Sequence, residues 1–113
     1  MNKTKLLILF TILTFIAAYS GALVYVYTHE TVHAITFSNF GISSIMYVGY
    51  DLSGWTMANQ SQYEFQQNEF LSTVHSINDS IGYHTAVIIF NLYLIFSIYL
   101  FYQICFNRKE DTR

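Results

Sequence analysis

The chain has 113 residues, of which 53% are hydrophobic, 19% aromatic and only 11% charged. A water-soluble domain carries about 25% charged residues, so this composition excludes an ordinary soluble fold and favours a membrane protein. A net charge of −2, with every Lys and Arg near a chain end, argues against nucleic acid as a partner. The single cysteine, Cys105, excludes an internal disulfide.

Two apolar segments, residues 6–27 and 80–107, contain no Asp, Glu, Lys or Arg. Each exceeds the roughly 20 residues with which a helix crosses a hydrocarbon core of about 30 Å, and no proline interrupts either segment. We therefore predict an all-α membrane protein that forms one membrane domain over residues 1–113. Its two transmembrane helices, at about 6–28 and 83–107, form a helical hairpin.

The basic residues indicate the orientation. They all lie at the chain ends, outside the apolar segments: Lys3, Lys5, Arg108, Lys109 and Arg113. Because positively charged residues stay on the cytoplasmic side, we expect both termini in the cytoplasm and the central segment, about 29–80, on the extracytoplasmic side. Alternatively, the first segment is a cleaved signal peptide, since its basic start and small residues at 20–22 fit that pattern. Both interpretations place the central segment outside.

The central segment changes its pattern near residue 44. Two short β-favouring runs flank Asp51 and Gly54, which predicts a small β-hairpin over residues 44–58. Trp55 and Met57 on this hairpin either line a substrate groove or pack onto the membrane surface. We predict a first helix over about 5–37. Since Gly and Pro are absent between the hairpin and Gly82, a second helix should start at about residue 62 and continue to 107.

Directly after the first apolar segment the chain reads His29-Glu30-Thr31-Val32-His33, the pattern His-Glu-x-x-His. On a helix, residues four apart lie on one face, so His29 and His33 can bind one zinc ion through neutral imidazoles. Glu30 projects about 100° round the helix, where its carboxylate can take a proton from water at the metal. The motif therefore predicts a hydrolytic zinc site. The alternative is that these are polar residues ending a membrane helix at the surface.

The motif resembles that of the zincin metallopeptidases, in which it lies on a helix and a third zinc ligand follows later in the chain. In the gluzincin group that ligand is a Glu preceded by Asn, and this chain has Asn68 before Glu69 and Asn78 before Asp79. In the aspzincins and the site-2-type intramembrane proteases the ligand is an Asp, which again indicates Asp79. The resemblance implies a gluzincin-like or aspzincin-like metallopeptidase that uses Zn²⁺.

Depth along each helix narrows the choice of third ligand independently of any family. At 1.5 Å per residue, His29 and His33 lie roughly 3 and 9 Å beyond the first apolar segment. Asp79 lies about 6 to 11 Å beyond the second span and His75 about 12 to 17 Å, so Asp79 fits best and His75 is the alternative. His84 points away from His75 by about 180°, which argues against His84 as a further ligand.

Small residues lie on the same helix faces as the candidate ligands. Ala18 and Ala22 on the first helix, and Gly82 and Ala86 on the second, allow two membrane helices to approach closely. Tyr83 is a candidate catalytic residue that steadies an oxyanion. Its alternative role is in a belt of aromatic residues at the membrane surface.

The sequence therefore predicts a membrane-integral zinc metallopeptidase that hydrolyses peptide bonds near the outer membrane surface. Zinc is held by His29, His33 and Asp79 or His75, and Glu30 is the general base. The alternative is a non-catalytic small two-span subunit of a larger membrane complex, with a structural metal or a polar interhelix site. A metal-delivery protein is a third option. The expected partners are the lipid bilayer, a peptide substrate or other membrane subunits, and further copies of the chain in an oligomer.

Overall fold

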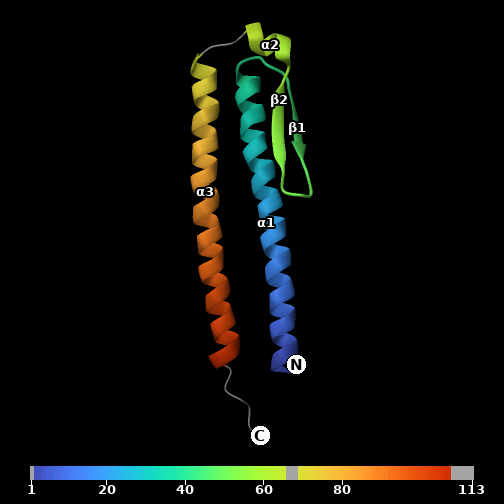
Figure 1. Cartoon of the computed structure of the whole chain (residues 1–113), viewed down its shortest axis with the longest axis vertical. Helices are drawn as coiled ribbons and strands as arrows, with labels where there is room; N and C mark the ends of the chain where they lie inside the picture. The colour runs from blue at the N-terminus through green and yellow to red at the C-terminus, as the bar shows by residue number, and fades with distance from the viewer. Residues whose placement is uncertain (1, 66–68, 108–113) are drawn as a thin grey trace. The chain divides into compact units, whose positions relative to one another are not determined.

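The computed structural model describes residues 2–65 and 69–107, and it is mostly helical (Figure 1). The elements in chain order are helix α1 (Lys3–Asn39), strands β1 (Ser44–Val48) and β2 (Gly54–Ala58), and helices α2 (Gln60–Phe65) and α3 (Glu69–Tyr102), followed by a π-helical turn, Gln103–Asn107. The prediction of two long apolar helices with a small hairpin between them is confirmed. Both α1 and the helical segment from Glu69 to Phe106 are long and apolar enough to cross a membrane.

The helix boundaries differ from the predicted ones. α1 begins and ends two residues beyond its predicted range of 5–37. The predicted second helix, residues 62–107, is represented by two separate elements, α2 and α3. The part of that prediction covering residues 66–68 lies outside the described residues.

A Schellman turn ends α1. Gly41 adopts a left-handed φ of 71°, its N–H donates to the Ser38 carbonyl at 2.9 Å, and the Ile42 N–H donates to the Phe37 carbonyl at 3.0 Å. The Phe37 and Ile42 side chains then pack with Leu71 of α3 in a small apolar core. The turn therefore reverses the chain, and β1 returns along α1.

Residues 49–53 connect the two strands of the hairpin. β1 and β2 pair antiparallel, and the loop is closed by the Gly49 N–H, which donates to the Ser53 carbonyl at 2.8 Å. The Asp51 carboxylate accepts hydrogen bonds from the Ser53 hydroxyl at 2.6 Å and the Ser53 N–H at 3.1 Å. These bonds hold the pKa of Asp51 below its ordinary value. Leu52 occupies the left-handed position with φ of 65°, where glycine or asparagine is usual.

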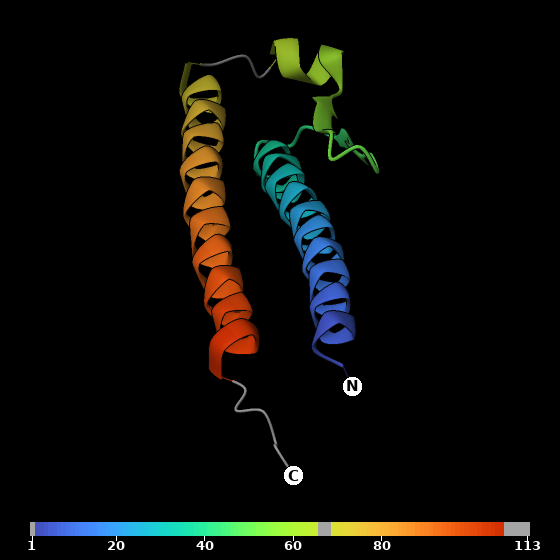
Figure 2. The same cartoon turned by 60° about the horizontal axis from the view of Figure 1, so that its bottom comes forward.

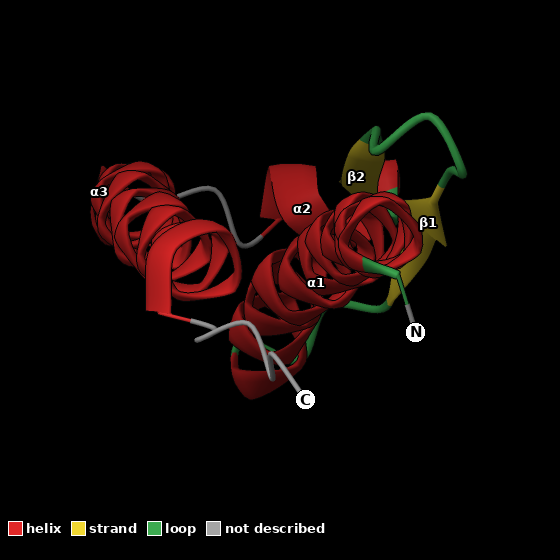
Figure 3. Cartoon of the chain, turned by 90° about the horizontal axis from the view of Figure 1, so that it is seen from below, coloured by secondary structure: helices red, strands yellow, loops and turns green. Residues whose placement is uncertain are grey.

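The chain divides into two compact units, each containing part of α1 and part of α3. We call Gly21–Ala86 the site unit, and Met1–Ser20 with Val87–Arg113 the terminal unit. In the site unit, the hairpin and α2 gather at the C-terminal part of α1 (Figures 2 and 3). Every residue that is buried in the described part of the chain belongs to the site unit.

The terminal unit holds its two helical segments together with few polar contacts. The Tyr93 hydroxyl donates to the Thr14 carbonyl, and the Lys3 ammonium donates to the Cys105 carbonyl at 2.7 Å. The other described side chains of this unit are largely apolar and exposed. That distribution suits a hydrocarbon environment rather than water.

Candidate metal centre

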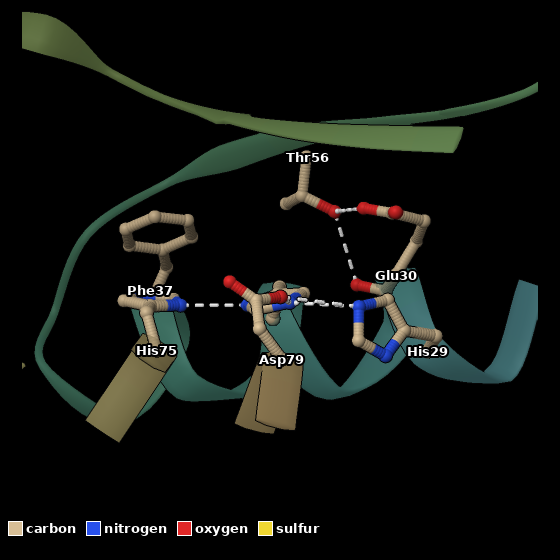
Figure 4. Close-up of a pocket in the computed structure, with 7 residues that line it drawn as sticks. His29, Glu30, Phe37, Thr56, His75 and Asp79 are labelled. Atoms are coloured by element: carbon tan, nitrogen blue, oxygen red, sulfur yellow. Dashed lines mark hydrogen bonds and ion pairs between the residues drawn. The ribbon is translucent and has the colours of Figure 1, made fainter. Parts of the chain in front are cut away.

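Three elements of the site unit converge on one small cavity of about 220 Å³ (Figure 4). α1 contributes four of the lining residues, β2 contributes one and α3 contributes two: His29, Glu30, His33, Phe37, Thr56, His75 and Asp79. The α1 residues lie in the last three turns of that helix. His29, His33 and Phe37 are spaced by four positions, so they share one face of the helix. Glu30 projects about 100° round the helix from His29.

Two imidazoles and one carboxylate meet closely enough to hold a metal ion. His33 Nε2 lies 3.2 Å from His29 Nε2 and 2.9 Å from Asp79 Oδ1, and His29 Nε2 lies 3.3 Å from the same oxygen. Two ligand atoms of a tetrahedral zinc ion, each about 2.0 to 2.1 Å from the metal, lie roughly 3.3 Å apart. The three donor atoms therefore match one face of a tetrahedral zinc site in chemistry and in spacing.

The ligand set is buried on one side and open on the other. The His33 side chain is 11% exposed and that of His29 25%, while the Asp79 side chain is 65% exposed. Water can therefore reach the ligand set from the side of Asp79.

His75, the alternative third ligand, contacts the other side of His33. The two Nδ1 atoms lie 2.7 Å apart and the rings stack with centroids at 5.0 Å. A neutral His33 ring that offers Nε2 to a metal carries its proton on Nδ1, so its Nδ1–H donates a hydrogen bond to His75 Nδ1. His75 thus fits the role of a residue that orients a ligand, and Asp79 fits the role of the ligand itself.

The environment of His75 favours its neutral form. Burial lowers the pKa of His75, the nearby His33 lowers it further, and the Asp79 carboxylate opposes both effects. The Phe37 ring packs on it with centroids 4.3 Å apart. Its Nε2 is buried and has no hydrogen-bond partner among the described residues. A neutral His75 can accept the hydrogen bond from the His33 N–H, whereas a charged one has no acceptor nitrogen.

Glu30 is buried against the hairpin (Figure 4). Its Oε2 lies 2.7 Å from the Thr56 hydroxyl, which also lies 3.0 Å from the Glu30 backbone carbonyl. β2 approaches so closely at Gly54 that an added Cβ would lie 2.9 Å from Glu30 Cγ. The hairpin therefore fixes the position of this carboxylate within the same cavity as the candidate metal ligands.

Sequence reasoning missed Thr56. The available signal was strand alternation, because β2 places Gly54, Thr56 and Ala58 on one face and Trp55 and Met57 on the other. A polar residue between two small ones marks the face that can lie against a polar helix. Nothing in the sequence, however, indicates which helix residue it meets.

α1 and α3 approach each other closely beside the candidate ligands. The Tyr25 hydroxyl donates to the Gly82 carbonyl, and a Cβ added at Gly82 would lie 2.6 Å from His29 Cε1. The absence of a side chain at Gly82 is thus what allows the His29 ring to fit between the helices. This is the close approach expected of small residues in paired helices.

Tyr83 and His84 do not line the cavity. The Tyr83 side chain is 70% exposed and its ring packs edge-on against that of His84, with centroids 5.7 Å apart. Tyr83 lies four residues beyond Asp79, which is about one helical turn or 6 Å farther along α3. The structure brings together the predicted residues His29, Glu30, His33, His75 and Asp79, and it leaves Tyr83 outside that group.

A larger groove of about 640 Å³ adjoins the cavity and shares Phe37, Thr56 and His75 with it. Four consecutive residues of β2, 55–58, line this groove. Successive side chains of a strand point to opposite faces, so four in a row can line one groove only along the edge of the strand. Among the described residues β2 pairs with β1 alone, which leaves this edge unpaired.

No protein-family model, curated protein or solved structure matches the chain.

Proposed function

We propose that the chain is a membrane-integral zinc metallopeptidase that cleaves peptide bonds near the outer membrane surface. The observation that carries the proposal is the convergence of His29, His33 and Asp79 at 2.9 to 3.3 Å in the cavity that also contains Glu30. In the proposed arrangement α1 and α3 cross the bilayer, both termini are cytoplasmic, and the cavity lies outside.

The residues divide the chemistry between them. His29, His33 and Asp79 would hold the zinc ion, which when bound would supply Lewis-acid chemistry toward the peptide carbonyl and a water molecule. Glu30 takes a proton from the water molecule as its oxygen attacks the carbonyl carbon, and returns a proton to the amine nitrogen as the C–N bond breaks. Thr56 holds the Glu30 carboxylate at the cavity wall.

The groove along β2 supports a peptide as the substrate. An unpaired strand edge offers backbone N–H and C=O groups in a row, and an extended peptide binds such an edge by adding a strand. The groove is continuous with the metal cavity through Phe37, Thr56 and His75. A peptide bound there would extend toward the candidate zinc ligands.

A second candidate function is a non-catalytic subunit of a membrane complex that uses the same cluster as a structural metal or polar interhelix site. The contact that favours it is the one between Glu30 and Thr56, because a carboxylate held by a hydroxyl is already satisfied without a catalytic role. The two functions differ in whether the charge of Glu30 is needed for turnover.

The experiment that tests the peptidase compares wild type with Glu30→Gln. The amide oxygen of Gln can still accept the Thr56 hydrogen bond, so we expect the variant to fold and to retain zinc. Loss of the base should lower cleavage of a membrane-proximal peptide library by about 10² to 10⁴. Glu64→Gln on exposed α2 is the matched control and should leave cleavage unchanged. Zinc-loaded wild type that cleaves no peptide, or no faster than Glu30→Gln, would contradict the peptidase.

A further inference from the structure

One face of the hairpin is apolar and lies opposite the face that carries Thr56, while Trp55 and Met57 also border the groove along β2. Strand alternation places two cross-strand pairs on this face, Ile45 with Met57 and Tyr47 with Trp55. Their side chains are between 44% and 69% exposed, and the rings of Tyr47 and Trp55 stack with centroids 5.4 Å apart. We call these four residues the outward face.

The outward face is unlike the water-exposed side of an antiparallel sheet. Such a side normally carries polar residues that alternate with the buried apolar ones. Here the inner face carries the polar Thr56, and the outward face carries only apolar and aromatic side chains. An aromatic pair of this kind gains free energy when it leaves water, so water is a poor environment for it.

The loop of the hairpin also exposes apolar and aromatic side chains. Tyr50 is 88% exposed, and Leu52 occupies a left-handed backbone position that favours glycine or asparagine. A leucine at that position is strained, because its Cβ crowds the backbone. The strain has no compensating core contact, since Leu52 is itself exposed.

The depth of the loop along α1 indicates which environment it meets. Gly54, the first residue of β2, lies so close to α1 that an added Cβ would be 2.6 Å from Val26. Val26 belongs to the uncharged segment 6–27, whose helix is apolar and long enough to cross a membrane. The hairpin thus runs from the C-terminal end of α1 back to the level at which the apolar segment ends (Figure 1).

Charge sets a limit on how deep the loop can go. Asp51 is the one charged residue between Glu30 and Glu64, and no Lys or Arg occurs between Lys5 and Arg108. An ionised carboxylate is excluded from hydrocarbon but tolerated among lipid headgroups. The boundary between headgroups and acyl chains, where Trp and Tyr are enriched, is therefore the depth that suits the loop and the outward face together.

We propose that the outward face of the hairpin is a membrane-docking surface, with Tyr47 and Trp55 seated at the boundary between the headgroups and acyl chains of the outer leaflet. The proposal rests on the membrane arrangement given under the proposed function, and it does not depend on catalysis. Docking on one face of the hairpin fixes the other face, where Thr56 holds Glu30. The membrane surface would then set the depth at which the site works.

Trp55 is the only tryptophan in the chain, so the fluorescence of the unaltered protein tests the proposal. The full chain is reconstituted in phosphatidylcholine vesicles, and its emission is quenched either by aqueous iodide or by lipids brominated at different depths. We expect strong quenching by lipids brominated near the headgroup end of the chain, weaker quenching by lipids brominated near the methyl end, and little quenching by iodide.

A matched control moves the probe to a part of the site unit far from the outward face. The double variant Trp55→Phe with Phe65→Trp places it on exposed α2, which packs beside Phe37 through Tyr63. Phe37 lies 11 residues above Val26, or about 16 Å. This probe should be quenched by iodide several-fold more than Trp55 and should not respond to brominated lipids.

Two results would overturn the docking surface. Iodide quenching of Trp55 as strong as that of the α2 probe would place the outward face in water. Protection from both iodide and brominated lipids would place it against another copy of the chain or another protein. Resistance of the reconstituted protein to alkaline extraction tests the membrane spans separately, and zinc content of the same sample tests the metal site.

Discussion

The two units of the chain are built from the same two helices but distribute their side chains in opposite ways. In the site unit the buried residues include the polar Glu30, His33 and Thr36. In the described part of the terminal unit no residue is buried, and large apolar side chains such as Phe15 and Ile98 are exposed. One unit hides polar groups from its surroundings, and the other presents apolar groups to them.

The difference indicates which interactions stabilise each unit. Exposed apolar helices need hydrocarbon around them, because lipid replaces water as their solvent. Buried polar groups need partners, because a buried donor or acceptor without one costs about 1 to 3 kcal/mol. Substitutions in the polar cluster should therefore change stability and the site together, while polar-to-apolar changes in the terminal unit should change neither.

The largest of these stability effects should come from Thr56→Val, which removes the hydroxyl that contacts Glu30. A hydrogen bond to a charged group contributes about 1.5 to 3 kcal/mol, and the valine would leave the Glu30 carboxylate buried without that partner. We expect a loss of this size in the free energy of unfolding, measured by denaturation of the protein in detergent. Thr56→Ser keeps the hydroxyl and should retain most of the stability. Equal stability of all three proteins would show that Glu30 does not depend on the hairpin.

A smaller effect is expected from Gly82→Ala, because the new Cβ would lie 2.6 Å from His29 Cε1. Overpacking of this kind costs about 1 to 3 kcal/mol, and here it would also displace a candidate zinc ligand. Gly21→Ala is the matched control, since an added Cβ there meets nothing within 4 Å, and alanine stabilises a helix by about 0.5 to 1 kcal/mol relative to glycine. The two variants should thus shift the melting temperature in opposite directions. A stabilising Gly82→Ala would refute the close helix approach.

The smallest effect should come from Asn91→Leu in the terminal unit. The Asn91 amide donates to the Val87 carbonyl of its own helix, at 2.9 Å, and the residue is exposed. An exposed substitution of this kind usually changes stability by less than about 0.5 kcal/mol. Zinc content and unfolding should both match wild type. A loss of zinc in this variant would break the contrast between the two units.

Local sequence patterns carried most of the prediction of the fold. Uncharged segments of sufficient length predicted the two helices, and the β-favouring runs around Asp51 and Gly54 predicted the hairpin, because these features depend on local sequence. The Schellman end of α1 was not predicted, although Gly41 is a known signal for it. The predicted second helix covers both α2 and α3, and its part at residues 66–68 lies outside the described residues.

The site was predictable in the part that depends on helical geometry. The four-residue spacing predicted that His29 and His33 share a face, depth favoured Asp79 over His75, and helical phase argued against His84. Thr56 could not be found, because its contact with Glu30 depends on how the hairpin packs against α1. Tyr83 lies outside the cavity, and its catalytic role stays a prediction.

The most direct measurement is the zinc content of the purified full-length protein, of Asp79→Ala and of His84→Ala. Wild type should contain roughly one zinc ion per chain, as a single tetrahedral site requires. Asp79→Ala removes a donor atom that lies within 3.3 Å of both His29 and His33 and should lose the metal, whereas His84→Ala, outside the cavity, should retain it. Loss of zinc from His84→Ala together with full retention by Asp79→Ala would contradict the account.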